Sequence, residues 1–470
     1  MLSPIFPLGL VWSSGLSSIF SCRLNSRWGR EGAGQPQCNP TIKNSPNENN
    51  IKFLKREAGG AGLGWLKHLL SLANTRSKMW LFIVVACLIP QVTFSKGLIR
   101  HQNPQQSMSI SEIIQYWEYP SQEYEVLTDD GYYLQVNRIP SGKHAPNKRG
   151  PKPSVLLLHG FGAEGRCWIA NLPNNSLAFV LADSGYDVWI LNNRGTTWSR
   201  RHKTLSNNQN AFWDFSFHEM GMYDVPATIN FIQQKTKVEG LYVISQAQGS
   251  TLGLIAFSAM PELAKKIKLF VCLAPTYTMV DIKGPTLPFM LLPEGFIRLV
   301  WGNKEFSLLN KEMKKAISTL CSYKGLDRIC LEFIFMSEGR NENNLNVSRV
   351  DVYLGLFPDS SSVKTPIHWN QVFKSKEFKQ FDYGSNNKIM YNMTTPPFYK
   401  IEDMTVPTAV WNGGKDLMTS KKDIELLLPR IPNLVFYKYI PDWQHVDFLW
   451  GLDAPERLFP DMLYLMKQYI

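Results

Sequence analysis

The 470-residue sequence lacks the concentrated charge of a nucleic-acid-binding protein. Charged residues make up only 19% of the chain, and the net charge of +11 is unevenly distributed. Residues 1–95 contain 10 Lys and Arg against 3 Asp and Glu, whereas the rest of the chain contains 40 against 36. Since nucleic-acid binding needs a clustered basic face, the nearly balanced body argues against a nucleic-acid partner.

Apolar runs long enough for a comfortable membrane span are also missing. The clearest apolar run covers about ten residues, Trp80 to Ile89, and follows the basic residues Arg76 and Lys78. A run of this length before small residues such as Ser95 is typical of a secretory signal peptide, and a signal anchor is the weaker alternative. We therefore predict a signal peptide over residues 79–95 and no integral membrane span.

The segment before this signal is rich in Gly, Ser and Asn and has no sustained hydrophobic period. A signal peptide ordinarily begins a protein, whereas this one begins at the internal Met79. We therefore predict that residues 1–78 are an upstream extension, either disordered or an artefact of the gene model. A targeting leader is the alternative, because the segment contains arginines and few acidic residues.

Motifs that hold ions or cofactors are missing as well. The sequence has no cluster of His, Cys, Asp and Glu at metal-ligand spacing and no phosphate-binding glycine loop. We therefore expect no metal and no cofactor.

Cysteine is scarce, with seven residues in the chain and four of them after Ser95. Cys321 and Cys330 are nine positions apart in a polar stretch and could close a small disulfide loop in an oxidising compartment. Cys167 and Cys272 have apolar neighbours, which predicts buried free thiols.

Three N-x-[ST] sequons occur, at Asn174, Asn346 and Asn392. Each is weak evidence alone, since such triplets are common by chance. Together with the signal peptide they predict a glycoprotein of the secretory pathway, either secreted or lysosomal.

Strands and helices alternate from about residue 120 onward. Two predicted strands flank the turn at Asp129–Gly131, and continuous apolar runs at 154–160 and 186–193 are typical of strands covered on both faces. A helical period runs through residues 218–236. With 44% hydrophobic residues, the pattern predicts an α/β fold with a mostly parallel central sheet, an antiparallel hairpin at its start and helices on both faces.

The alternation breaks between about residues 276 and 399, where prolines, aromatics and irregular polar runs replace it. We predict an inserted cap over the carboxyl ends of the strands, where open α/β sheets bind ligands. Within it, the Met- and aromatic-rich stretch 287–306 has two interpretations. It is either core and cap packing, or an apolar lid and a wall for an acyl chain.

The stretch LYVISQAQGSTLG, residues 241–253, reads as a buried strand, a tight turn and a helix. That layout normally carries G-x-S-x-G and presents a nucleophilic serine at its apex in a positive-φ conformation. Here the five positions are Ser245-Gln246-Ala247-Gln248-Gly249. The last glycine is present, but the apex residue is alanine, which has no atom that can attack an ester.

Two further parts of a Ser-His-Asp triad follow in α/β-hydrolase order. Asp416 comes directly after a predicted strand, and His445 comes after the last predicted strand. The H-G turn after the strand ending at Leu158 would supply one oxyanion donor, the backbone N–H of Phe161. The backbone N–H of Gln248 would supply the other. Because both donors are backbone groups, alanine at the apex does not remove them.

These features and several longer segments resemble the acid lipase family, the gastric and lysosomal neutral-lipid hydrolases of animals. The segments include ISEIIQYWEYPSQEYEV, RGTTWSRRH, VPTAVWNGGKDL and HVDFLWGLDAPE. The resemblance runs from about Met79 to the end of the chain. It implies an α/β-hydrolase fold with about eight strands, an inserted cap and lid, a signal peptide at the equivalent of Met79, and hydrolysis of triacylglycerols or sterol esters.

By position, the family's G-H-S-Q-G motif falls on Ser245–Gly249. The resemblance therefore makes Ala247 the nucleophile position and puts Gln246 where the family has histidine. Asp416 and His445 match the other two triad members.

The resemblance also assigns Phe161 and Gln248 to the oxyanion hole, although the family usually has leucine at the first position. It matches Cys321 and Cys330 to the disulfide of the cap. The expected organisation is an extension (1–78), a signal peptide (79–95), a first core part (96–275), a cap and lid (276–399) and a second core part that carries Asp and His (400–470).

Two functions are compatible with this sequence. Loss of the triad serine costs about 10⁶-fold in turnover in a well-studied protease, and neither Ser245 nor Ser250 should reach both the oxyanion hole and His445. We therefore expect a lipase-like pseudoenzyme that binds a neutral lipid or fatty acyl ligand, with contact to a lipid–water interface. The alternative is an active triacylglycerol or sterol ester lipase that uses another nucleophile or has a misreported turn sequence. A third, weaker hypothesis is a protein on whose activity no selection acts.

Overall fold

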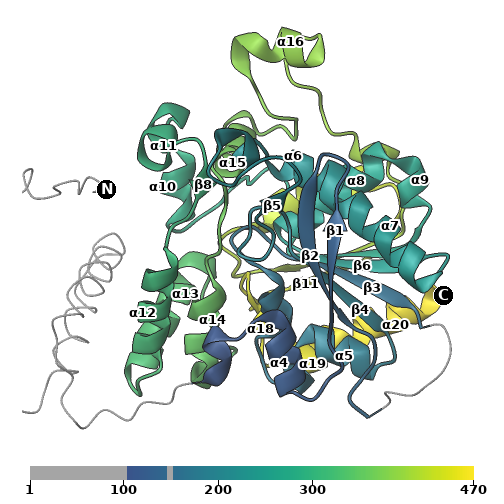
Figure 1. Cartoon of the computed structure of the whole chain (residues 1–470), viewed down its shortest axis with the longest axis vertical. Helices are drawn as coiled ribbons and strands as arrows, with labels where there is room; N and C mark the ends of the chain where they lie inside the picture. Colours follow the sequence, from purple (N-terminus) through teal and green to yellow (C-terminus); the bar gives the residue numbers. More distant parts are fainter. Residues whose placement is uncertain (1–102, 145–151, 470) are drawn as a thin grey trace, which may run out of the picture. The chain divides into compact units, whose positions relative to one another are not determined.

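The computed structural model describes residues 103–144 and 152–469 (Figure 1). The predicted extension (1–78) and signal peptide (79–95) lie outside the described residues. Within the described part, the centre is a nine-stranded sheet ordered β1-β2-β4-β3-β6-β7-β10-β11, and β5 pairs with β2 beside this path. The strands are β1 (Gln122–Leu127), β2 (Tyr132–Ile139), β3 (Ser154–Leu158), β4 (Asp187–Leu191), β5 (Arg201–His202), β6 (Leu241–Gln246), β7 (Ile267–Leu273), β10 (Thr408–Gly413) and β11 (Leu434–Ile440).

Strand directions match the sequence-based prediction. The β1–β2 hairpin and the β2–β4 pair are antiparallel, whereas every neighbouring pair from β4 to β11 is parallel. The predicted mostly parallel sheet with an antiparallel hairpin at its start is confirmed. The continuous apolar runs are strands covered on both faces, as predicted, because β3, β4, β6 and β10 are buried at every position.

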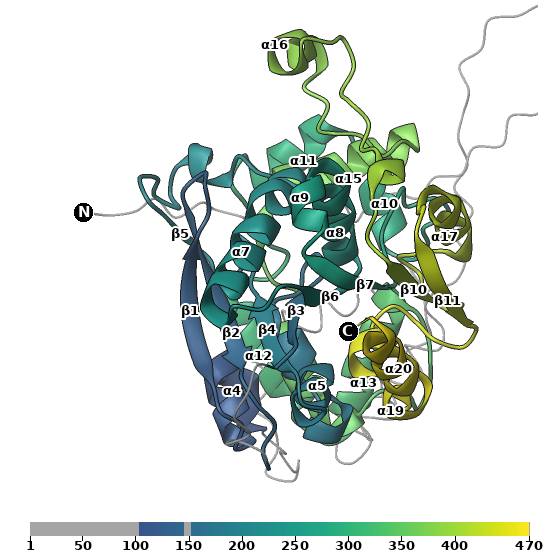
Figure 2. The same ribbon diagram turned by 90° about the vertical axis from the view of Figure 1, so that its right-hand side faces the viewer.

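Alternate residues of the central strands point into two separate apolar cores. In β3, Val155 and Leu157 belong to the first core, whereas Leu156 and Leu158 belong to the second. Helices therefore cover both faces of the sheet (Figure 2). The first core contains side chains of α4 (Ile110–Tyr116), α5 (Leu177–Asp183) and α20 (Phe459–Gln468), and the second contains side chains of α7 (Val225–Thr236), α8 (Gln248–Ala259) and α17 (Lys421–Leu427).

Four short helices complete this part of the chain. They are α6 (Phe217–Glu219), α9 (Pro261–Ala264), α18 (Asp447–Trp450) and α19 (Ala454–Arg457). Helices α18 and α19 connect the last strand, β11, to the final helix α20. Within the described ranges, no helix is both long and apolar enough to cross a bilayer.

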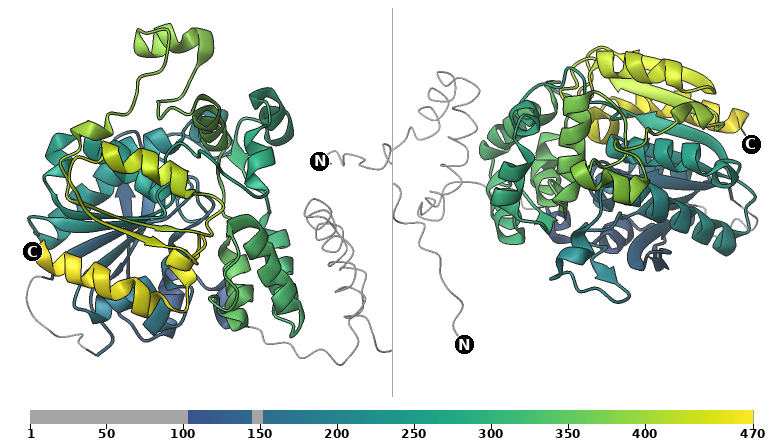
Figure 3. Two further views of the ribbon diagram at one scale, coloured as in Figure 1. Left: turned by 180° about the vertical axis from the view of Figure 1, so that it is seen from behind. Right: turned by 90° about the horizontal axis from the view of Figure 1, so that it is seen from above.

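Between β7 and β10 the chain leaves the central sheet and forms mainly helices. Its elements are α10 (Thr286–Met290), α11 (Glu294–Trp301), α12 (Lys311–Cys321), α13 (Leu326–Glu338), α14 (Val350–Leu356), α15 (Lys364–Ser375) and α16 (Asn387–Tyr391), with a two-stranded sheet of β8 (Glu305–Phe306) and β9 (Ser361–Ser362). In Figure 3 these helices gather beside the central sheet, and α16 projects from the body. Helix α14 is anchored in the first core, where Tyr353 stacks on Trp450 with ring centroids 4.5 Å apart.

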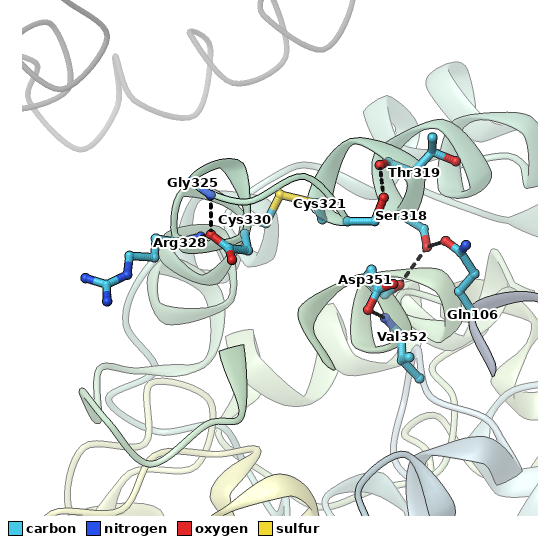
Figure 4. Close-up of a disulfide and its surroundings, with 11 residues drawn as sticks. Gln106, Ser318, Thr319, Cys321, Gly325, Arg328, Cys330, Asp351 and Val352 are labelled. Atoms are coloured by element: carbon cyan, nitrogen blue, oxygen red, sulfur yellow. Dashed lines mark hydrogen bonds between the residues drawn. A yellow bond between two sulfur atoms is a disulfide. The ribbon is translucent and has the colours of Figure 1, made fainter. Parts of the chain in front are cut away.

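A disulfide joins α12 to α13 through Cys321 and Cys330 (Figure 4), as the resemblance implied. Beside it, the Ser318 hydroxyl donates to the backbone carbonyl of Asp351 at 2.7 Å, so α12 is also tied to α14. The other two cysteines of the described chain, Cys167 and Cys272, are buried free thiols, as predicted. Burial raises the pKa of both thiols, which makes thiolate chemistry unfavourable at either position.

Arg194, in the loop after β4, is the centre of a buried charge network. Its guanidinium donates to Asp224 at 2.7 Å and to both carboxylate oxygens of Asp130 at 2.5 and 2.8 Å. The same group lies 4.0 Å from the ring centroid of Tyr132. Arg194 therefore ties the β1–β2 turn and the start of α7 to the end of β4.

Replacing Arg194 with methionine is expected to lower the free energy of unfolding by about 3–5 kcal/mol, because it leaves the fully buried Asp224 without its cationic partner. Urea denaturation of the secreted full chain measures this. Arg201→Met is the control, since Arg201 pairs with Glu125 on the surface and its loss should cost less than about 1 kcal/mol. Equal losses in the two variants would contradict the network's role.

Candidate functional site

The candidate site residues gather at one edge of the sheet because they follow strands that run in the same direction. Phe161 follows β3, Ala247 follows β6, Asp416 follows β10 and His445 follows β11. The carboxyl ends of parallel strands meet at a common edge, where open α/β sheets bind ligands. The structure therefore brings the sequence-predicted positions together.

The β6–α8 turn has the backbone conformation expected of a nucleophile elbow. Ala247 has φ 50° and ψ −121°, a positive φ that L residues rarely adopt. Gly249 is required for packing, since a Cβ there would lie 2.2 Å from the carbonyl oxygen of Leu158. The predicted positive-φ apex is confirmed, although the residue that occupies it is alanine.

The two serines nearest the apex are occupied elsewhere. The Ser245 hydroxyl donates to the backbone carbonyl of Val271 and lies 2.9 Å from the Ser250 hydroxyl. Both serines are fully buried, and the Ser245 contact leads to β7 rather than to His445. This geometry agrees with the expectation that neither serine replaces the missing nucleophile.

Asp416 and His445 form a hydrogen-bonded pair. His445 Nδ1 lies 2.8 Å from Asp416 Oδ2. The other carboxylate oxygen accepts the backbone N–H groups of Met418 and Thr419 at 2.8 and 2.7 Å, which fixes the orientation of the carboxylate. The pair therefore has the arrangement in which a carboxylate holds an imidazole in one tautomer.

Burial and charge act in opposite directions on His445. Burial by itself lowers the pKa of the imidazole, but the charge and hydrogen bond of Asp416, together with the charge of Glu338, outweigh burial and raise the pKa above its ordinary value of 6.5. The buried imidazole therefore lies near charged carboxyl groups, and ionisable groups in such surroundings are often found at functional sites.

Glu338, which sequence reasoning missed, connects the inserted segment to this pair. It ends α13, and its backbone carbonyl accepts the N–H groups of both Leu417 and His445 at 3.2 Å. Its side chain is 5% exposed, and burial raises the pKa of the carboxyl group. No sequence signal marks a glutamate at a helix end as a partner of a histidine 107 positions later.

Gln246 makes the second contact that sequence reasoning missed. Its side-chain nitrogen lies 3.0 Å from His445 Nε2, and both residues are buried. Nε2 is the atom that takes the proton from the nucleophile in a Ser-His-Asp triad. The available signal was the glutamine in place of the family's histidine, but the sequence did not show where its amide points.

The two residues predicted to supply oxyanion donors, Phe161 and Gln248, have side chains that contact the inserted segment. Gln248 is the first residue of α8, where a helix leaves backbone N–H groups without intrahelical acceptors. Its side-chain oxygen accepts the indole N–H of Trp369 at 2.8 Å. Phe161 stacks on Phe306 with ring centroids 5.8 Å apart. Both contacts come from the inserted segment, so their geometry does not depend on a serine at Ala247.

The other histidines near the sheet edge have structural partners. His159 Nδ1 lies 2.9 Å from the carbonyl of Gly160, and its Nε2 accepts the backbone N–H of Asn193. His218 Nδ1 lies 2.9 Å from the hydroxyl of Tyr399. These contacts give His159 a structural role in the turn after β3.

The sequons differ in exposure. Asn174 and Asn392 are exposed, whereas Asn346 is partly buried and its side-chain oxygen accepts the N–H and hydroxyl of Ser348. Glycosylation at the three positions stays a prediction.

Replacing Asp416 with asparagine should lower the pKa of His445, because burial is then opposed only by the charge of Glu338. In the natural protein the raised pKa of His445 increases the free energy of unfolding. This contribution is complete below pH 6.5 and is lost as the pH rises through the pKa of the folded state. The variant should therefore lose more stability at pH 5 than at pH 8, measured by urea denaturation. Asp461→Asn, at an exposed partner of Lys438, is the control. Equal losses of stability at the two pH values would contradict this assignment.

Comparison with known proteins adds a second line of evidence. A family model described as a partial α/β-hydrolase lipase region matches residues 110–172, and one described as the α/β hydrolase fold matches residues 153–452. Human lipase member M is 46% identical over 400 residues, which are 84% of this chain and 95% of that protein. Human lysosomal acid lipase/cholesteryl ester hydrolase is 46% identical over 397 residues, which are 83% of this chain and 100% of that protein.

Among solved structures, a soluble variant of monoglyceride lipase from Saccharomyces cerevisiae has 16% sequence identity and a TM-score of 0.45, covering 78% of this chain and 98% of its own. The identity to the human lipases extends over nearly their whole length. The model for the α/β hydrolase fold covers residues 153–452, which include strands β3 to β11 and the β6–α8 turn. The chain therefore belongs to the acid lipase family of α/β-hydrolases.

Proposed function

We propose that this protein binds a neutral lipid or fatty acyl ligand and does not hydrolyse it. The observation that carries the proposal is the elbow, which keeps its strained apex with alanine in place of a nucleophile. The Asp416–His445 hydrogen bond and the position of Gln248 at the start of α8 support the proposal.

The chemistry follows from the side chain at the apex. The methyl group of Ala247 has no lone pair with which to attack an ester carbonyl. Removing the serine from a triad costs about 10⁶-fold in turnover, and the remaining 10³–10⁴-fold over water comes from the oxyanion hole and binding. The neighbouring hydroxyls of Ser245 and Ser250 are bound to each other. A protein of this kind keeps the means to bind an ester and lacks the means to form an acyl-enzyme.

The stretch 287–306 supports contact with lipid. Met290, Ile297 and Phe306 of this stretch are buried, as core packing requires, whereas Leu291 and Leu299 are 60% and 80% exposed. Exposed apolar side chains gathered on one short segment are typical of surfaces that meet a membrane or another protein. Both interpretations of the stretch therefore have support, and we assign its exposed side to a lipid–water interface.

Several features support a route through the secretory pathway. The Cys321–Cys330 disulfide suits an oxidising compartment, and two of the three sequons are exposed. Human lysosomal acid lipase/cholesteryl ester hydrolase is named for the lysosome. We assign this protein to the secreted or lysosomal space on these grounds.

An active ester hydrolase is the second candidate. The intact Asp416–His445 pair favours it, since this pair is the proton-handling part of the family mechanism. It would need a nucleophile other than residue 247 or a serine at that position in the natural protein.

The full chain, secreted from an animal cell host, should not hydrolyse short-chain or long-chain acyl esters above the no-enzyme rate, because it has no nucleophile at residue 247. A serine-directed fluorophosphonate should leave it unlabelled for the same reason. Fluorimetric ester assays and intact-mass spectrometry measure the two properties, with a lipase of intact triad as positive control. Turnover well above the no-enzyme rate would establish the hydrolase, and the labelled peptide would identify the attacking residue.

Leu299→Asp should reduce adsorption of the secreted protein to a triolein emulsion about tenfold, because the variant loses the burial of one leucine side chain in the lipid. Flotation of the emulsion measures the bound fraction. Leu426→Asp, at an exposed leucine of α17, is the matched control and should adsorb like the natural protein. An equal loss of adsorption in the two variants would show that the segment 287–306 is not the contact surface.

A further inference from the structure

The geometry points to Gln246 as a second inactivating residue, whose amide occupies the proton-accepting atom of His445. This inference rests on the proposed function, since it concerns a site that has already lost its nucleophile. It adds that restoring serine at residue 247 is not sufficient to restore the hydrolase, because the base that must activate the serine is already engaged.

The hydrogen bonds of His445 define the roles of its two ring nitrogens. Nδ1 faces the carboxylate of Asp416 at 2.8 Å, and a carboxylate only accepts, so Nδ1 carries the proton. A neutral imidazole then has one acceptor, the lone pair on Nε2. The side-chain nitrogen of Gln246 lies 3.0 Å from that atom and donates to it.

The three side chains therefore form a continuous chain of hydrogen bonds. The amide of Gln246 donates to His445, and His445 donates to Asp416. A serine hydroxyl introduced at residue 247 has to compete for the same lone pair before it can transfer its proton. The amide itself does not replace the serine, because it has no acidic proton at physiological pH and is not a nucleophile.

Packing holds the amide in this position. Gln246 is the last residue of β6 and is 3% exposed, and its backbone pairs with Leu273 of β7. On the other side, a Cβ added to Gly160 would lie 2.5 Å from the side-chain oxygen of Gln246 and 3.0 Å from the Cβ of Ala247. The amide is thus enclosed between the turn after β3 and the imidazole, and the glycine at residue 160 makes room for it.

The arrangement also explains why a buried Asp–His pair persists without a serine. Buried polar atoms are almost always hydrogen-bonded, and an imidazole nitrogen that has lost its serine needs another partner. Gln246 supplies one within the protein. Gln246 and Ala247 are adjacent in sequence and act on the same lone pair, the first by occupying it and the second by removing its reaction partner.

A set of four full-length secreted proteins tests this inference: the natural chain, Ala247→Ser, Gln246→Ala, and the double variant. Labelling by a fluorophosphonate and turnover of a short-chain acyl ester are followed in each. We expect the natural chain and Gln246→Ala to be inert, Ala247→Ser to react slowly, and the double variant to react about tenfold faster than Ala247→Ser, the effect of one hydrogen bond. A double variant that reacts no faster than Ala247→Ser, whether both are fast or both inert, would overturn the inference.

The outcome for the natural chain separates the two claims. If the natural chain labels or turns over ester, the proposed function fails, whatever the variants do. If it is inert and the two serine variants are equal, only the role of Gln246 fails.

A spectroscopic readout makes the test independent of activity. The ¹⁵N resonance of His445 Nε2 should shift between the natural chain and Gln246→Ala at a pH where the imidazole is neutral, because the variant loses the donor. Gln246→Glu should raise the pKa of His445 in a ¹H–¹⁵N titration, because its carboxylate adds to the charges of Asp416 and Glu338. An Nε2 resonance that is the same in the natural chain and Gln246→Ala would contradict the contact in solution, and the amide proton dispersion of each variant verifies folding.

Discussion

The close contact between the β6–α8 turn and the end of β3 determines the rest of the site. Gly249 approaches the carbonyl of Leu158 so closely that no side chain fits between them. Two residues earlier, Ala247 has a positive φ and lies beside Gly160 of the neighbouring turn, where an added Cβ would come within 3.0 Å of the Cβ of Ala247. The geometry of the elbow is therefore set by backbone packing and not by the nucleophile, which is why it survives the loss of the serine hydroxyl.

The sequence predicted the central sheet and the positions of the site residues because both depend on local patterns. Apolar runs marked the buried strands, and the positions of Asp416 and His445 after the last two predicted strands indicated that their side chains meet at one edge of the sheet. Two contacts with His445 could not be predicted from the sequence. The direction of the Gln246 amide is a choice of side-chain rotamer, and the approach of Glu338 depends on how the inserted segment folds back over the sheet.

The inserted segment contributes contacts to the site. Trp369 of α15 holds Gln248, and the backbone of Glu338 at the end of α13 holds His445. Neither contact requires a reaction at Ala247, so a binding function can preserve both. The buried Asp–His–Gln chain of hydrogen bonds and its contact with the inserted segment require no catalysis to be stable.

The fate of a bound ester tests the central claim most directly. The secreted full chain would be incubated with an isotopically labelled triacylglycerol or sterol ester and re-isolated, and its ligand extracted and weighed by mass spectrometry. The account predicts that the labelled ester is recovered with the protein and is intact. Recovery of labelled free fatty acid, in amounts that grow with time and exceed a protein-free control, would contradict it.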